Sequence, residues 1–119
     1  MPQWKQFHAE SDGFQVKIWG EDEILQLNFL VNKGVILNKK LNPALRADFL
    51  RLELLHEFGG LYADVDMTCE RNVFQALYQE FNMDAVELVT GVSNTSVLEL
   101  NNGVILSKPK STVLSKMIQ

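Results

Sequence analysis

The spacing of hydrophobic and polar residues changes several times along the chain, and each change marks the border of a predicted element. The segment "FQVKIW", residues 14–19, has apolar residues at every second position, which predicts a strand. Residues 42–58 start with Asn-Pro, carry apolar residues at helical spacing and stop at two glycines, which predicts a long helix. This alternation of strands and helices predicts an α/β layered domain.

The other predicted elements are short, and together they account for most of the remaining chain. Residues 34–40 fit either a short strand or a further helical turn, and Ser111 is placed to cap the last helix. The length of 119 residues suits one domain, residues 1–119. Helices are predicted for residues 1–8, 21–31, 73–81 and 112–118, and strands for residues 61–63, 85–90 and 103–108.

The long predicted helix carries charged residues on two different sides. A helical projection places Arg46, Glu53 and Glu57 together, on a face expected to contact solvent. Asp48 and Arg51 interrupt the apolar side and are three residues apart, so they can form an ion pair. Such a pair is either structural or part of a polar pocket beside the strand that follows the glycines.

Composition narrows the classes of function. The hydrophobic share of 46% and the net charge of −4, without a run of Lys or Arg, fit a globular protein and argue against a nucleic-acid partner. The single cysteine, Cys69, excludes an intrachain disulfide. No apolar run approaches the length of a membrane span. The first twenty residues carry four charges and lack the pattern of a secretory signal, so a cytoplasmic location is expected.

Two aspartates, Asp64 and Asp66, follow the Gly-Gly turn and a short apolar run. On an extended chain they can share one side, where like charges about 4 Å apart repel by roughly 1–4 kcal/mol, depending on shielding. Three interpretations remain open at this point. The pair binds a divalent metal with a nucleotide diphosphate, performs phosphoryl transfer as in D-x-D-x-T phosphatases, or forms a solvated acidic loop.

The stretch "RADFLRLELLHEFGGLYADVDM", residues 46–67, resembles the DXD-containing sugar-binding region of glycosyltransferases. This family includes yeast-type mannosyltransferases, capsular sugar transferases and glucosylating bacterial toxins. Residues 3–24 and 100–118 show a weaker similarity to flanking segments of the same family. The positions that match the signature are Ala47, Asp48, Arg51, Gly59, Gly60, Tyr62, Asp64 and Asp66.

The resemblance implies a nucleotide-sugar transferase fold of the GT-A (Rossmann-like) type. It also implies that a hexosyl group is transferred from a UDP- or GDP-sugar to a sugar or protein acceptor, with Mn²⁺ or Mg²⁺ as cofactor. Asp64 and Asp66 would be the catalytic metal ligands. The residues implied to bind the donor are Asp48, Arg51, Tyr62, Asp64 and Asn102, with Asn101 as the alternative to Asn102.

The chain also departs from the family pattern, because nothing in it matches the strand that begins the family's fold. The expected fold is therefore a partial one without its first strand, truncated at both ends, in a chain that self-associates to cover the exposed sheet edge. This departure keeps two alternatives open: a non-catalytic or degenerate module, or partner subunit, that binds metal or nucleotide sugar, and a D-x-D-x-T phosphohydrolase.

Overall fold

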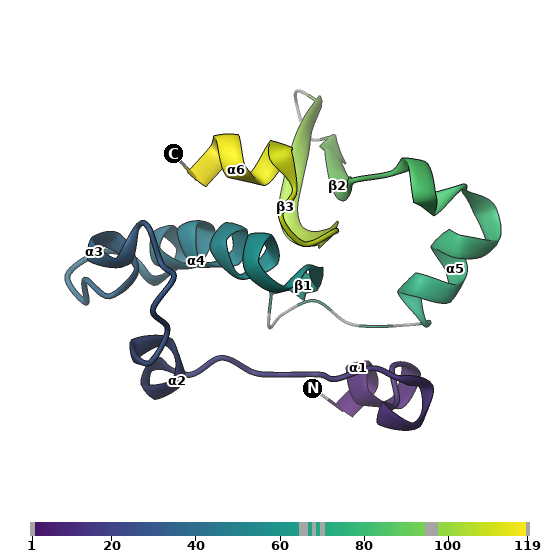
Figure 1. Cartoon of the computed structure of the whole chain (residues 1–119), viewed down its shortest axis with the longest axis horizontal. Helices are drawn as coiled ribbons and strands as arrows, with labels where there is room; N and C mark the ends of the chain where they lie inside the picture. The colour runs from purple at the N-terminus through teal and green to yellow at the C-terminus, as the bar shows by residue number, and fades with distance from the viewer. Residues whose placement is uncertain (1, 65–66, 68, 70, 95–97, 119) are drawn as a thin grey trace.

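The computed structural model describes residues 2–64, 67, 69, 71–94 and 98–118 (Figure 1). In this part of the chain no helix is long and apolar enough to cross a lipid bilayer. The helices are α1 (Pro2–Phe7), α2 (Glu21–Leu25), α3 (Lys33–Ile36), α4 (Pro43–Phe58), α5 (Val73–Glu80) and α6 (Thr112–Ile118), with 3-10 turns at Glu10–Asp12 and Met83–Ala85. The strands are β1 (Gly60–Ala63), β2 (Leu88–Asn94) and β3 (Leu98–Ser107).

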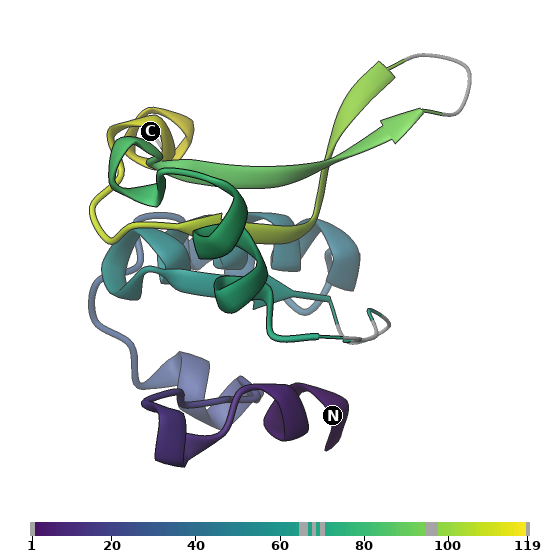
Figure 2. The same cartoon turned by 90° about the vertical axis from the view of Figure 1, so that its right-hand side faces the viewer.

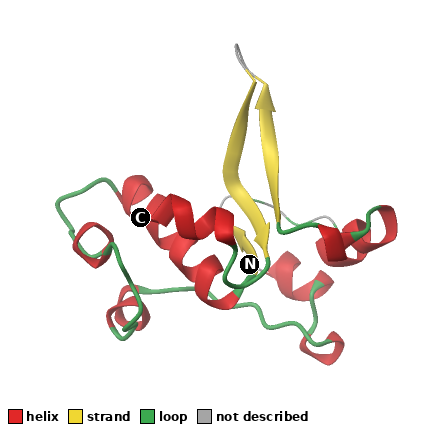
Figure 3. Ribbon diagram, turned by 45° about the horizontal axis from the view of Figure 1, so that its top comes forward, coloured by secondary structure: helices red, strands yellow, loops and turns green. Residues whose placement is uncertain are grey.

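The three strands form one antiparallel sheet in the order β1-β3-β2. Leu106 of β3 lies opposite Leu61 of β1 and Val89 of β2, which places β3 in the centre. The register shifts between Thr90 and Gly91, and beyond this point the β2–β3 hairpin projects from the body of the molecule (Figures 2 and 3). The mixed α/β class is therefore confirmed, in the form of a small antiparallel sheet.

Helix α4 begins and ends where the sequence predicts. The Asn42 side chain accepts a hydrogen bond from the Ala44 N–H at 2.8 Å and caps the helix. Gly59 ends the helix at a φ of 68°, and a Cβ at this position would lie 2.6 Å from the Pro109 ring. Gly60 follows with a φ of 95°. Only glycine satisfies both the backbone angle and the close approach at position 59, so the Gly-Gly pair determines how the chain turns from α4 into β1.

Two small hydrophobic clusters pack against different sides of α4. One contains Ile36 of α3 with Leu50 and Leu54, covered by partly buried residues from the connections around α2 and α3. The other contains Leu55 with Ile105 of β3 and Leu114 of α6. Figure 1 shows α3 and α6 lying against α4, with the sheet at its carboxyl end. Helix α4 is therefore the central element to which the site is attached.

The predicted strand at residues 14–19 is wrong, because this segment pairs with no strand among the described residues. It runs extended from α1 towards α2 (Figure 1). Together with β1 and the end of α4 it lines a cleft of about 760 Å³. Trp19, Leu54, Phe58 and Leu61 are among the residues that line this cleft. A strand requires a neighbour that shares its ladder of hydrogen bonds, and the alternating pattern alone does not supply one.

Other predicted boundaries moved as well. The helix expected at residues 21–31 stops at Leu25, and the following residues pack as a loop against α4. The ambiguous segment 34–40 contains the short helix α3. Residues 83–85 form a 3-10 turn, so the strand predicted at 85–90 starts at Leu88 and extends to Asn94, while β3 starts before the predicted position 103. Pairing between β2 and β3 lengthens both strands beyond what their apolar runs indicate.

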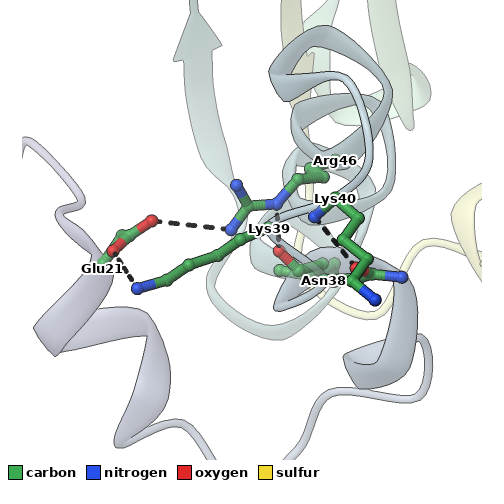
Figure 4. Close-up of polar contacts among 6 residues, drawn as sticks. Glu21, Asn38, Lys39, Lys40 and Arg46 are labelled. Carbon is green, nitrogen blue, oxygen red and sulfur yellow. Dashed lines mark hydrogen bonds and ion pairs between the residues drawn. The ribbon is translucent and has the colours of Figure 1, made fainter.

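The predicted solvent face of α4 is also wrong, since Glu53 is only 3% exposed. Its carboxylate accepts hydrogen bonds from the backbone N–H groups of Val31 and Asn32, the latter at 2.9 Å. Arg46, on the same side, donates to the Ile36 carbonyl at 2.8 Å and lies 3.7 Å from Glu21 (Figure 4). The α2–α3 connection crosses this side of the helix, which a helical projection cannot reveal.

Candidate functional site

The site lies where β1 ends beside α4. The Gly-Gly turn sends β1 back along the helix, and the backbone N–H of Asp64 extends the strand pairing by donating to the Gly103 carbonyl at 2.9 Å. Asp64 is thereby fixed one residue beyond β1, next to Arg51 in α4. The local geometry follows from the helix stop and from the β1–β3 register, which holds Ala63 opposite Val104.

Arg51 is the centre of this site, and its side chain is only 4% exposed. Its Nη2 lies 3.2 Å from Asp48 Oδ1 and 3.3 Å from Asp64 Oδ1, so one nitrogen joins two carboxylates. Its Nε donates to the Ala47 carbonyl at 3.2 Å, and the guanidinium carbon lies 5.2 Å from the centre of the Tyr62 ring. The buried guanidinium is therefore restrained by four contacts, two with its own helix and two with β1 and the residue after it.

Tyr62 is half-buried beneath this cation, and its burial raises the pKa of the phenol above the usual value of 10.0. The Arg51 charge acts in the opposite direction and lowers this pKa, while Asp64 and Asp48 add smaller increases. The phenol therefore keeps its proton at neutral pH and can donate a hydrogen bond.

The structure brings together four of the predicted site residues, and it confirms the ion pair of Asp48 with Arg51. Asp48 is less buried than predicted, because 48% of its side chain is exposed. Asp66 lies outside the described residues, so the predicted shared cleft of Asp64 and Asp66 stays a prediction. Asn101 and Asn102 belong to β3, where Asn101 pairs with Gly91, and the predicted role of Asn102 also stays a prediction.

The carboxylates present fit a hard divalent ion in their chemistry. Asp64 offers an oxygen ligand with 37% of its side chain exposed, and carboxylate oxygens suit Mg²⁺ and Mn²⁺. Within the described residues, no group of three or more His, Cys, Asp or Glu side chains is arranged to bind a metal ion. Asp66, the next acidic residue in the sequence and the second predicted ligand, lies outside the described residues, so the metal site stays a prediction.

Two residues near this site were not singled out by the sequence reasoning. Trp4 of α1 contacts Met67, three residues after Asp64, and His8 contacts Val73 at the start of α5. Their spacing of four residues at a short amphipathic helix is the signal that could have found them, since it places both side chains on one face.

Comparison with known proteins identifies the family. Residues 2–85, more than half of the chain, match the glycosyltransferase sugar-binding region containing the DXD motif. The chain is also 34% identical over 104 residues to the uncharacterized glycosyltransferase L373 of Acanthamoeba polyphaga mimivirus. The chain therefore belongs to the DXD-containing glycosyltransferase family, as the resemblance predicted.

The extent of the match with the viral relative differs between the two proteins. The aligned region includes 85% of this chain but 39% of the relative, so the chain spans less than half of that protein's length. No solved structure matches the chain significantly.

Proposed function

We propose that the chain forms the donor-binding part of a metal-dependent glycosyltransferase, which transfers a hexosyl group from a UDP- or GDP-sugar to a sugar or protein acceptor. The observation that carries this proposal is the buried Arg51, held between the half-exposed carboxylates of Asp48 and Asp64. Membership of the family supports sugar transfer in general. The cluster of one cation, two carboxylates and a neutral phenol supports recognition of a charged, hydroxyl-rich donor.

Each residue of the cluster has a chemical role in this proposal. Arg51 directs its charge to the donor diphosphate and, through its two ion pairs, holds both carboxylates in place beside it. Asp48 accepts hydrogen bonds from hydroxyl groups of the donor sugar, and Tyr62 borders the same pocket as a neutral donor. Because Arg51 is held on four sides, little ordering of this side chain is needed when the donor binds.

Asp64 and Asp66 hold the divalent ion in this proposal. When bound, Mn²⁺ or Mg²⁺ neutralises the negative charge that develops on the departing diphosphate. The backbone hydrogen bond from Asp64 to Gly103 supports this role, because it orients the Asp64 side chain relative to the sheet. Asn102, on the strand beside Gly103, would contact the donor from the β3 side.

The partial GT-A-type fold and the self-association of the chain belong to the same proposal. Strand β1 lies at the edge of the described sheet, and its neighbour across the cleft is the unpaired segment 14–19. Two extended segments with an apolar cleft between them favour a further strand, which a second copy of the chain can supply. Light scattering at micromolar concentration should show a dimer or larger species, and a monomer would contradict this part of the proposal.

Calorimetric titration tests donor binding. The wild-type chain should bind UDP or GDP in the presence of Mn²⁺ and lose most of this affinity when the metal is chelated. Asp66→Ala should reduce the affinity by at least about tenfold, equivalent to about 1.4 kcal/mol. Asp84→Ala is the matched control, because Asp84 is an exposed aspartate in the 3-10 turn before β2. Nucleotide binding that chelation leaves unchanged would refute the metal-dependent site.

Turnover separates the proposal from its alternatives. Transfer or hydrolysis of the bound nucleotide sugar, with release of the nucleotide, supports an enzyme. Metal-dependent binding without turnover supports the non-catalytic module. Cleavage of a phosphate monoester such as p-nitrophenyl phosphate, without nucleotide binding, would replace the proposal with a phosphohydrolase.

A further inference from the structure

Helix α1 contacts the segment that links β1 to α5 through a side chain, although the two are more than sixty residues apart in sequence. The indole Nε1 of Trp4 donates a hydrogen bond to the Met67 carbonyl at 3.1 Å. The Met67 N–H in turn donates to the Asp64 carbonyl at 3.0 Å. Trp4 is only 7% exposed, so a buried side chain of α1 is joined through Met67 to the backbone of Asp64.

His8 makes a second contact, at the far end of the same segment. Its Nε2 accepts a hydrogen bond from the backbone N–H of Val73, the first residue of α5, at 3.1 Å. Because a backbone N–H can only donate, Nε2 carries no proton, and the ring proton is on Nδ1, which lies 3.2 Å from the Trp4 carbonyl. The His8 ring is 5% exposed and stacks on Trp4 with 5.7 Å between ring centres.

A third contact comes from Asn72, which precedes α5. Its Nδ2 donates to the Phe7 carbonyl at 3.0 Å, while its Oδ1 accepts from the Gln75 N–H at 2.9 Å and caps the helix. The same side chain therefore starts α5 and binds it to the end of α1. With the bonds of Trp4 and His8 and the 4.0 Å contact of Cys69 Sγ with His8 Nδ1, four polar contacts join α1 or its following residue to the described residues of the segment from Met67 to Val73.

We infer that Trp4 and His8 are positioning residues that anchor the segment carrying the D-x-D motif and so set its metal-dependent affinity for nucleotide. The link to nucleotide rests on the proposed function. The Trp4 bond holds the segment at Met67, three residues after Asp64, and the Phe7–Asn72 and His8–Val73 bonds hold it at its carboxyl end, where α5 begins. Metal ligands need supporting groups that hold them to a fraction of an ångström, and such groups are usually hydrogen-bonded neighbours.

The chemistry of the contacts distinguishes an anchor from ordinary packing. Both Trp4 and His8 form hydrogen bonds with backbone groups of the segment, Met67 O and Val73 N, and therefore restrain the backbone conformation of the segment. The Trp4 and His8 side chains are themselves buried, and a buried polar group left without a partner is costly. Met67 follows Asp66 directly in the sequence, so the Trp4 bond acts one residue from the expected metal ligand.

Amide hydrogen exchange tests the anchor without any ligand. Trp4→Phe removes the indole donor and keeps an aromatic ring. Trp19→Phe is the matched control, since no hydrogen bond of the Trp19 indole occurs among the described residues and its ring stacks on Phe58 of α4. Trp4→Phe should accelerate exchange in residues 64–73, and Trp19→Phe should leave that segment unchanged. Equal protection of residues 64–73 in the wild type and in Trp4→Phe would overturn the inference.

Nucleotide titration tests the consequence for the metal site. The quantity measured is the ratio of the UDP or GDP affinity with Mn²⁺ to that without it, in variants shown by circular dichroism to be folded. Trp4→Phe and His8→Leu should lower this ratio by about 10-fold, the usual effect of losing a group that supports a metal ligand. His8→Gln should restore much of it, because the amide oxygen can accept the Val73 N–H. A merely structural role would leave the ratio unchanged in folded variants, and that result would overturn the positioning role.

The two measurements separate the inference from the proposed function. A wild-type chain whose nucleotide affinity does not respond to Mn²⁺ refutes the proposed function and with it the role of the anchor in metal binding. Hydrogen exchange still decides in that case whether Trp4 anchors the segment. Metal-dependent binding in the wild type, combined with unchanged exchange in Trp4→Phe, would leave the proposed function standing and refute the anchor.

Discussion

Replacing Arg51 with methionine perturbs the site at its centre. Met keeps an unbranched apolar side chain in the buried space, and it removes the charge that joins Asp48 to Asp64. We expect this variant to fold and to lose donor binding. Two quantities decide this expectation: the loss in free energy of unfolding and the loss in nucleotide affinity.

The stability cost should be modest. Breaking a fully buried ion pair costs about 3–5 kcal/mol, mainly because a charge is left buried without a partner. Here the buried partner is the one removed, while the Asp48 and Asp64 side chains are 48% and 37% exposed and remain hydrated. Each lost pair is therefore closer to a surface ion pair, at up to about 1 kcal/mol, which gives a total loss of about 1–2 kcal/mol.

The loss of donor affinity should exceed what the loss of stability explains. A hydrogen bond from a cation to a charged group contributes about 1.5–3 kcal/mol, so losing the Arg51 contact with a diphosphate should weaken binding by more than tenfold. Urea denaturation measures the stability, and calorimetric titration with UDP or GDP and Mn²⁺ measures the affinity. The two assays together show whether the loss of binding exceeds the loss of stability.

Arg46→Met is the matched control for this experiment. Arg46 lies in the same helix, donates to the Ile36 carbonyl at 2.8 Å and approaches Glu21 at 3.7 Å, on the side that faces the α2–α3 connection (Figure 4). It should lower stability by a similar amount and leave nucleotide affinity unchanged. Wild-type affinity in a folded Arg51→Met variant, or an equal loss in Arg46→Met, would refute the assignment of Arg51 to the donor site.

Three further predictions concern the fold and its dependence on pH. Glu53→Ala should lower the free energy of unfolding by about 2–4 kcal/mol in urea denaturation, since two backbone donors lose a charged acceptor. The control Glu57→Ala breaks an exposed ion pair with a lysine and should lower the free energy of unfolding by less than about 1 kcal/mol. Equal losses in the two variants would contradict the prediction. Because the pKa of Tyr62 is raised in the folded state, the phenol keeps its proton at pH values where the unfolded chain has lost it. The free energy of unfolding should therefore fall as pH rises above 10.0. Tyr62→Phe should reduce that fall in alkaline denaturation. Hydrogen bonds from the start of α6 lower the pKa of Glu87, so its stabilising effect should be present above pH 4.5 and disappear as pH falls further; acid denaturation of Glu87→Gln with an unchanged midpoint would contradict this.

Features that depend on neighbours along the chain could be predicted from the sequence. The Asn-Pro start and Gly-Gly end of α4, and the strand after it, depend on capping and on backbone angles that one or two residues set by themselves. The Asp48–Arg51 ion pair follows from a spacing of three residues on a helix. These short-range features place the Asp48–Arg51 pair and Asp64, whereas their grouping with Tyr62 in one site was implied by the resemblance to the glycosyltransferase family.

Features that depend on contacts between distant segments were decided only by the tertiary structure. Glu53 has the helical phase of a solvent residue and is nevertheless buried, because the α2–α3 connection crosses its side of α4. Residues 14–19 alternate like a strand and remain unpaired, because no described strand lies beside them. The bond from Trp4 to Met67 joins residues 63 positions apart. A local pattern determines how a segment can fold, but which surfaces meet depends on the chain path as a whole, since long-range contacts form only when the free energy they gain exceeds the entropy lost in closing the loop between them.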